Sequence, residues 1–293
     1  MAESASRLRR MTVEPRRLAV LGSPIAHSQS PALHAAAYRV LGLPWQYEAI
    51  EMTTAGLPAF IGSCTPDWRG LSLTMPLKRD VLPLLDSRNR FAELTGAANT
   101  VLFDSTGLRG FNTDVYGMTE AFRSAGITRL RSVRIIGGGA TAASAVAAVA
   151  ALGAKRVAVS ARSPEKLLGL LDLAEQLHVD LQADPLGAVD DGIVPDAVIS
   201  TIPGGAELEL DFDRRTRSSA IFFDVAYDPW PTPLAASWLE AGGRVLSGLD
   251  MLVYQAIMQV RIFVGGSPSR RLRGEASVLD AMRAAVGQLP ANA

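Results

Sequence analysis

The sequence has 293 residues, 48% of them hydrophobic, and its 29 basic residues balance its 29 acidic ones, which predicts about two folded domains and excludes a disordered chain. Neutral charge leaves no basic surface for nucleic acid or an anionic membrane, and no apolar run reaches the ~18 residues of a membrane span. With one cysteine and three histidines, neither a disulfide nor a zinc site is expected, so the sequence predicts a cytoplasmic protein without a metal.

The first part of the chain begins with an arginine-rich stretch that lacks the apolar core of an export signal, and we interpret residues 1–16 as a flexible tail. The apolar run 18–22 predicts a buried strand. Apolar residues at helical spacing from Leu33 to Leu41 predict a helix that Gly42 ends. Further elements expected here are strands at 70–74 and 99–103, a helix beginning near 76 and a helix at 115–124.

The middle of the chain alternates strands with helices. A strand at 133–136 leads into the glycine-rich turn 137–139, an alanine-rich helix that ends near 152 and a strand at 157–160. This order is typical of a dinucleotide-binding unit. A helix at 164–177 and strands at 197–201 and 220–225 are expected to follow. The alternation predicts a doubly wound parallel sheet, that is, a Rossmann-like domain.

The predicted fold class is therefore α/β with two domains, of which the first is discontinuous. The apolar helix expected at 249–264 is predicted to return the chain to the first domain. Our predicted limits are 17–112 and 247–293 for the first domain and 113–246 for the Rossmann-like domain.

The glycine turn has the pattern G-x-G-x-x-A. Gly137 permits a tight turn, Gly139 lets a pyrophosphate approach the backbone, and the helix that follows offers free N–H groups to phosphates. A glycine-rich turn that binds nothing is the alternative.

The end of the next strand indicates which dinucleotide would bind. NAD requires an acidic residue there, whereas NADP requires a cation for its 2′-phosphate. The segment holds Arg162 and Ser163, with Lys166 close behind, and has no acidic residue before Glu165. An arginine makes a forked contact with phosphate, so NADP is favoured over NAD. A solvated loop arginine is the alternative.

Several polar residues follow the expected strands of the first domain. We interpret Ser30 as the N-cap of its helix, with Pro31 after it, which leaves Ser28 free to bind a ligand. His34 is interpreted as a packing residue. Lys78 lies in the first turn of a helix, where a cation opposes the helix dipole but is well placed for proton transfer. A solvated lysine is the alternative at this position.

Three further positions carry polar groups where the pattern is apolar or where a helix begins. The run 112–114 (Asn-Thr-Asp) predicts one capping side chain and leaves the others for a ligand. Beside Lys78, Asp114 would complete a pair that handles a proton. Asn99 in an apolar strand and Gln255 in an apolar helix both need hydrogen-bond partners. Those partners are either core groups or ligand hydroxyls.

Seven motifs taken together resemble the shikimate/quinate dehydrogenase family, and the resemblance covers nearly all of residues 18–264. The motifs are GSPIAHSQSP (22–31), LTMPLK (73–78), GAANT (96–100), NTD (112–114), the glycine turn (137–142), DPWPTP (228–233) and the stretch 248–256.

The resemblance implies the reversible reduction of 3-dehydroshikimate to shikimate with NADPH, in aromatic amino-acid biosynthesis, by a monomer or homodimer. By similarity, Lys78 and Asp114 are the catalytic pair of a substrate-binding first domain. The residues implied to bind substrate are Ser28, Ser30, Thr74, Asn99, Tyr227 and Gln255. Those implied to bind NADP are Gly137, Gly138, Gly139, Ala140, Thr141, Arg162, Ser163, Lys166, Gly248 and Met251.

Four positions depart from the family pattern. Ser72 and Ala161 stand where asparagine is usual, Lys166 replaces an arginine, and Asp250 stands where glycine is common. Two alternatives remain: a relative that uses NAD to oxidise quinate or an aminated analogue, and a non-catalytic NADP-binding protein. The presence of both catalytic residues argues against the second.

Overall fold

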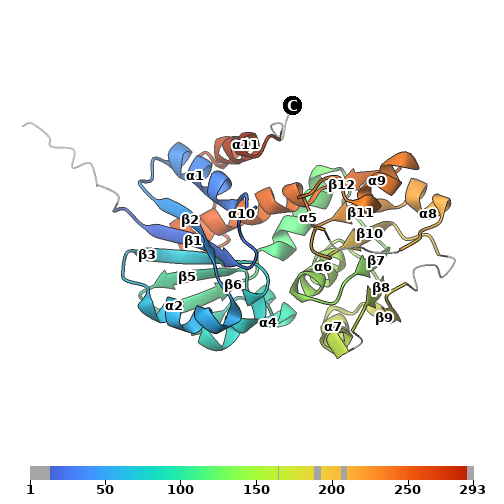
Figure 1. Cartoon of the computed structure of the whole chain (residues 1–293), viewed down its shortest axis with the longest axis horizontal. Helices are drawn as coiled ribbons and strands as arrows, with labels where there is room; N and C mark the ends of the chain where they lie inside the picture. The colour runs from blue at the N-terminus through green and yellow to red at the C-terminus, as the bar shows by residue number, and fades with distance from the viewer. Residues whose placement is uncertain (1–13, 164, 188–192, 206–209, 289–293) are drawn as a thin grey trace, which may run out of the picture.

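The computed structural model describes residues 14–163, 165–187, 193–205 and 210–288, with the side chains of 165 and 166 left out. Two α/β halves lie side by side, each built on a six-stranded sheet, and helices α5 and α10 lie where the halves meet (Figure 1). Most of the predicted tail, residues 1–13, lies outside the described residues. Arg16 already belongs to the fold, because its carbonyl accepts the Gln46 N–H at 2.9 Å.

The first half holds a mixed sheet with the strand order β2-β1-β3-β5-β6-β4. Strand β1 is parallel to both of its neighbours, and β5 is antiparallel to both of its own. The elements are β1 (Arg17–Gly22), α1 (Ser30–Leu41), β2 (Gln46–Glu51), α2 (Leu57–Ser63), β3 (Trp68–Leu73), α3 (Leu77–Asp80), β4 (Ser87–Arg88), α4 (Arg90–Thr95), β5 (Thr100–Asp104) and β6 (Gly107–Phe111).

The second half holds a fully parallel sheet. Read from its β9 edge, the order β9-β8-β7-β10-β11-β12 is that of a Rossmann sheet, with its switch point between β7 and β10. The elements are α5 (Asp114–Ser124), β7 (Ser132–Ile136), α6 (Ala140–Ala151), β8 (Arg156–Ala161), α7 (Glu165–Leu177), β9 (Asp180–Pro185), β10 (Ala197–Ser200), α8 (Arg214–Ser219), β11 (Ile221–Asp224), α9 (Pro233–Glu240) and β12 (Val245–Leu246).

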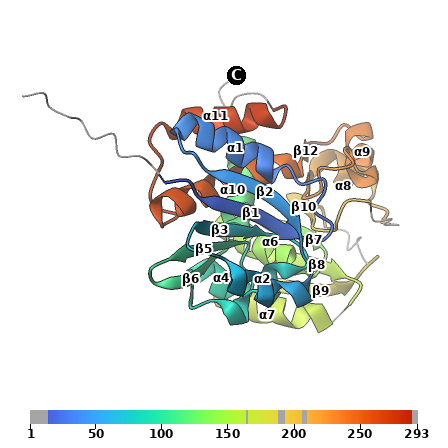
Figure 2. The same ribbon diagram turned by 60° about the vertical axis from the view of Figure 1, so that its left-hand side comes forward.

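The last two helices, α10 (Gly248–Gly265) and α11 (Glu275–Ala285), cover the first sheet again. Figure 2 shows α1, α10 and α11 on one face of that sheet and α2 with α4 on the other. Apolar side chains of β1 point to both faces of the sheet. Leu18 packs with Phe263 of α10 on one face, and Leu21 packs with Leu57 of α2 on the other. The predicted domain limits at 113 and 247 stay a prediction. None of the helices in the described ranges is long and apolar enough to cross a membrane.

His34 of α1 is fully buried among aromatic rings. Its ring is stacked on Tyr47, with centroids 3.9 Å apart, and its Nδ1 donates to the Ser30 carbonyl at 2.9 Å. Burial lowers the His34 pKa from 6.5 to about 4, because desolvation penalises the charged imidazolium. This histidine is therefore neutral in the folded protein over most of the physiological range.

This burial predicts a loss of stability in acid. Below pH 6.5 His34 is protonated in the unfolded chain, but in the folded protein it stays neutral down to about pH 4. The free energy of unfolding therefore falls as the pH decreases between these two values. His34→Phe removes the titration, so the drop between pH 7.5 and pH 4.5 should be smaller than in the wild type by about 2 to 3 kcal/mol. Urea denaturation at the two pH values measures it, and an identical drop in both proteins would refute the effect.

Candidate active site

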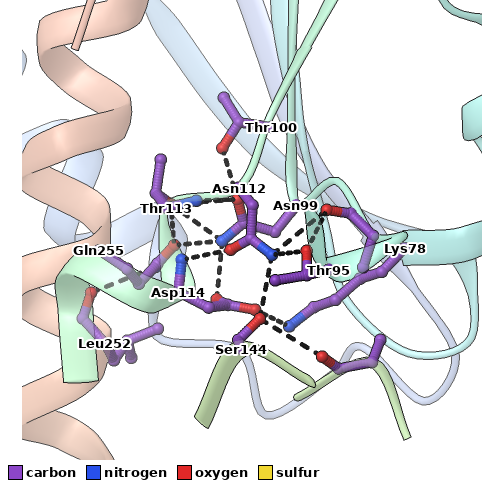
Figure 3. Close-up of polar contacts among 12 residues, drawn as sticks. Lys78, Thr95, Asn99, Thr100, Asn112, Thr113, Asp114, Ser144, Leu252 and Gln255 are labelled. Atoms are coloured by element: carbon purple, nitrogen blue, oxygen red, sulfur yellow. Dashed lines mark hydrogen bonds and ion pairs between the residues drawn. The ribbon is translucent and has the colours of Figure 1, made fainter. Parts of the chain in front are cut away.

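Lys78 and Asp114 form an ion pair at the junction of the two halves. Lys78 comes from α3, directly after β3, and Asp114 is the first residue of α5. Lys78 Nζ lies 2.6 Å from Asp114 Oδ2, and the two side chains are only 14% and 4% exposed (Figure 3). The structure thus brings together the two residues that the sequence paired. An ammonium held this close to a carboxylate can pass a proton to a bound oxygen and recover it.

Hydrogen bonds hold the Asp114 carboxylate and its backbone. Asn99 Nδ2 donates to Oδ1 at 2.7 Å, and the backbone N–H of Asp114 donates to Asn112 Oδ1 at 3.0 Å. Asn112 therefore supplies the capping side chain predicted for 112–114, whereas Thr113 occupies the N-cap position without a side-chain cap. A buried carboxylate is tolerated only when its charge and lone pairs are matched in this way.

Gln255 reaches the same cluster from α10. Its Oε1 accepts from Asn99 Nδ2 and from Thr113 Oγ1, both at 3.2 Å, and its Nε2 donates to the Leu252 carbonyl. Helix α10 approaches α5 closely because Gly117 has no side chain: a Cβ there would lie 2.8 Å from Gln255 Cβ. Gln255 has protein partners, and its contact with substrate stays a prediction.

The sequence reasoning missed a support behind Asn99. Ser72 Oγ donates to Gln259 Oε1 at 2.9 Å, and Gln259 Nε2 donates to Thr100 Oγ1 at 3.1 Å. Thr100 Oγ1 in turn donates to Asn99 Oδ1 at 2.9 Å. A second amide one helical turn after Gln255, in a mostly apolar helix, was the available signal. Ser72, which departs from the family pattern, thus has a defined structural partner.

Removing this support should cost stability. Gln259 is only 1% exposed, and Gln259→Ala would leave the Ser72 hydroxyl without its acceptor and the Thr100 hydroxyl without its donor. We expect the free energy of unfolding to fall by about 1 to 3 kcal/mol or more. The exposed Gln176→Ala is the matched control, with a change within about 0.5 kcal/mol. Equal urea midpoints for both variants would show that the network contributes nothing.

The segment between β1 and α1 differs in detail from the prediction. Ser30 is the first residue of α1 and not its N-cap, because Gln29 takes the cap position with helical dihedrals and no side-chain bond. Ser28 Oγ instead accepts the Ser30 N–H at 3.3 Å. Thr74, in the loop after β3, packs its methyl group against Gly22.

A loop of the second half reaches this segment. His27 Nδ1 lies 3.4 Å from Asp228 Oδ2. Burial raises the pKa of the neighbouring Tyr227, and the Gln29 backbone beside its hydroxyl partly offsets that rise. Tyr227 therefore lies beside the segment that carries Ser28 and Ser30, and residues of both halves meet here at their junction.

The glycine turn lies at the carboxyl end of β7, at the switch point of the parallel sheet. Gly137 has φ +114°, and a Cβ there would collide with the Thr201 hydroxyl. Gly139, by contrast, has no atom within 4 Å of the position that a Cβ would take. Helix α6 begins at Ala140, so its first-turn N–H groups and positive dipole end face this open space. Such a cradle fits the pyrophosphate of a dinucleotide.

The other predicted cofactor residues border the same edge of the sheet. Arg162 is exposed and Ser163 half-buried directly after β8, while the side chain of Lys166 lies outside the described residues. Gly248 begins α10 and packs so closely against the Val225 carbonyl, just after β11, that a Cβ would collide with it. Met251, in the same turn of α10, is buried. Within the described ranges, no three His, Cys, Asp or Glu side chains are placed to hold a metal ion.

Comparison with known proteins identifies the family. The model of the shikimate dehydrogenase substrate-binding domain matches residues 20–101. The NADP-dependent shikimate dehydrogenase of Citrifermentans bemidjiense is 37% identical over 265 residues, which are 85% of this chain and 90% of that protein.

Solved structures agree with this match. Shikimate dehydrogenase of Mycobacterium tuberculosis is 38% identical with a TM-score of 0.78, over 92% of this chain and 100% of that one. The Thermus thermophilus enzyme, crystallised with NADP(H) and shikimate, is 30% identical with a TM-score of 0.75, over 92% and 99% of the two chains. The chain therefore belongs to the shikimate dehydrogenase family.

Proposed function

We propose that this protein is an NADP-dependent shikimate dehydrogenase of the cytoplasm, a monomer or homodimer that interconverts 3-dehydroshikimate and shikimate in aromatic amino-acid biosynthesis. The observation that carries the proposal is the buried Lys78–Asp114 pair, 2.6 Å apart, at the junction with a Rossmann sheet. A chain that had kept the fold and lost the chemistry would have no reason to retain this pair, since a buried ion pair is poor evidence of stabilisation.

Lys78 and Asp114 handle the proton in this proposal. When bound, NADPH supplies the hydride for the ketone carbon. The protonated Lys78 Nζ donates its proton to the ketone oxygen as negative charge develops there, and Asp114 holds the ammonium in place. In the reverse direction, Lys78 accepts the proton of the shikimate hydroxyl that is oxidised.

The remaining residues bind and orient the substrate. The mutual hydrogen bonds of Asn99, Thr113 and Gln255 fix the direction of their polar atoms before substrate arrives, so little ordering is needed on binding. We assign Ser28, Ser30, Thr74 and Tyr227 to the other end of the substrate, since Tyr227 lies beside the backbone of Gln29, between the two serines. There they are suited to a carboxylate.

Arg162 is proposed to select NADP over NAD. Arg162→Ala would remove a charge-assisted, forked contact with the 2′-phosphate, so the ratio of kcat/KM for NADP⁺ to that for NAD⁺ should fall about 30- to 100-fold. Arg215→Ala, an exposed arginine on α8, is the control and should leave the ratio unchanged. Initial rates with both dinucleotides measure it, and an unchanged ratio in Arg162→Ala would remove this residue from the selection.

Genetic complementation tests the proposed function in the cell. A bacterial strain whose own shikimate dehydrogenase has been deleted should grow without aromatic amino acids when it expresses this chain. The same strain with Lys78→Ala should not grow, although both proteins accumulate equally. Failure of the wild-type chain to restore growth while it accumulates as folded protein would contradict the proposal.

A further inference from the structure

Asn112 is a buried residue that no proposed binding or catalytic step uses, yet it contacts three helices. Its side chain bonds to Thr95 of α4, to the backbone of Asp114 in α5 and to Ser144 of α6, and the residue is only 3% exposed. Figure 3 shows it beside these residues. Its Nδ2 donates to Thr95 Oγ1 at 2.8 Å, to Ser144 Oγ at 3.0 Å and to the Ala97 carbonyl at 3.2 Å. Its Oδ1 accepts the N–H of Asp114 at 3.0 Å.

The bond to Ser144 joins the two halves of the molecule. Asn112 follows β6 of the first sheet, whereas Ser144 lies in the first turns of α6, the helix that follows the glycine turn of the second sheet. Ser144 is fully buried, and its hydroxyl donates to the carbonyl of Ala140, the first residue of α6. Its oxygen is therefore left as an acceptor for Asn112.

These contacts form one continuous path. It runs from Ala140 at the phosphate-binding end of α6 through Ser144 and Asn112 to the backbone of Asp114, and from the Asp114 carboxylate to Lys78. Hydride transfer requires the hydride donor to face the ketone carbon while the proton-transfer group faces the ketone oxygen, and a misplacement of about 1 Å can cost about 100-fold in rate. The path therefore connects α6, the helix whose N-terminus would hold the dinucleotide, to Asp114, the residue that holds the Lys78 ammonium.

We propose that Asn112 and Ser144 are positioning residues that fix the start of α6 relative to Asp114 and so align the two halves for hydride transfer. This inference rests on the proposed function, and it assigns to the pair a role in alignment and not in folding.

The hydrogen bonds of Asn112 allow a role in alignment to be distinguished from a role in folding. The two hydrogens of Asn112 Nδ2 have three acceptors, so Ser144→Ala still leaves Thr95 Oγ1 and the Ala97 carbonyl for them. Alanine is also the best helix former, in a helix already rich in alanine. If Ser144 has a purely structural role, Ser144→Ala should change neither the stability nor the rate of hydride transfer by much. If Ser144 is a positioning residue, the same variant should slow hydride transfer.

The test begins with the protein alone, without substrate or dinucleotide. Spin labels are attached to cysteines introduced by Ala35→Cys on α1 and Glu175→Cys on α7, both exposed positions, after Cys64→Ser removes the native thiol. Pulsed electron resonance then gives the distribution of distances between the halves. We expect a broader distribution in Ser144→Ala than in the parent, and an unchanged one in the control Ser237→Ala, whose hydroxyl donates to the Leu234 carbonyl within α9.

Kinetics with shikimate deuterated at the oxidised carbon complete the test. In Ser144→Ala we expect kcat to fall about tenfold with a larger primary isotope effect, because hydride transfer itself is slowed, while the Kd values for shikimate and NADP⁺ stay within about twofold. A distance distribution and isotope effect equal to those of Ser237→Ala would overturn the positioning role. A wild-type chain that oxidises no shikimate would instead refute the proposed function, and the alignment proposal with it.

A double variant adds an independent criterion. If Asn112 and Ser144 act through the hydrogen bond between them, the double variant that carries both alanine substitutions should have the same kcat as Asn112→Ala alone. Losses that multiply would show that the two residues act separately and would overturn the proposal. Should Asn112→Ala fail to fold, the single Ser144→Ala variant still decides the question by its isotope effect.

Discussion

Replacing Lys78 with alanine should lower kcat for shikimate oxidation by about a thousandfold or more and leave the Kd of NADPH within about twofold. The ammonium is the group in the site that can give a proton to, or take it from, the reacting oxygen, and it lies on α3, in the half opposite the glycine turn. Turnover should collapse while the dinucleotide site stays intact. Steady-state rates and fluorescence titration with NADPH measure the two effects.

The neighbouring Arg79→Ala is the matched control, because it removes an exposed cation one residue away in the same short helix. Its kcat should stay close to that of the wild type. Thermal unfolding must accompany both measurements, since Lys78→Ala leaves the buried Asp114 without its ion-pair partner and lowers stability. A folded Lys78→Ala variant with wild-type turnover would remove Lys78 from the chemistry.

Asp114→Asn should reduce kcat by about a hundredfold to a thousandfold. The substitution keeps the size of the side chain and an oxygen for the Asn99 amide, but removes the negative charge 2.6 Å from Lys78 Nζ. The lysine then loses the group that orients its ammonium. Combined with Lys78→Ala, the substitution should cause little further loss, because the pair acts as a unit.

Asp80→Asn tests whether any carboxylate in this region matters. Asp80 lies at the end of α3 and accepts from Thr54 at 2.7 Å at the surface, so its variant should keep nearly full activity. Retention of more than about a tenth of wild-type kcat by Asp114→Asn would contradict the proton-handling role.

Local patterns made much of the architecture predictable. The strand, glycine turn and helix from β7 to α6 have a spacing that few other structures require, and Gly137 needs to be glycine because its φ is positive and a Cβ there would collide with the Thr201 hydroxyl. The helix at α10 was recognisable from its continuous apolar character. The pairing of Lys78 with Asp114 was predicted from the family resemblance, because both residues lie in motifs that carry it.

Other features could not be read from local patterns. Strand β2 is an edge strand with the mixed sequence QYEAIE and is mostly exposed, so it lacks the alternation that predicts strands. Helix α4 has six residues, too few for a helical period to show. The Asn112–Ser144 bond joins residues 32 positions apart on different halves, and sequence spacing contains no information about such a contact.

Initial rates of the purified wild-type protein, with shikimate and quinate each combined with NADP⁺ and NAD⁺, test the central claim most directly. Absorbance of the reduced nicotinamide follows all four reactions. We predict that kcat/KM for shikimate with NADP⁺ exceeds that of every other pair by on the order of tenfold or more, with the proposed contact of Arg162 to the 2′-phosphate setting the preference over NAD⁺. Equal or faster turnover of quinate with NAD⁺ would contradict the assignment, as would NADP⁺ binding without turnover of either acid.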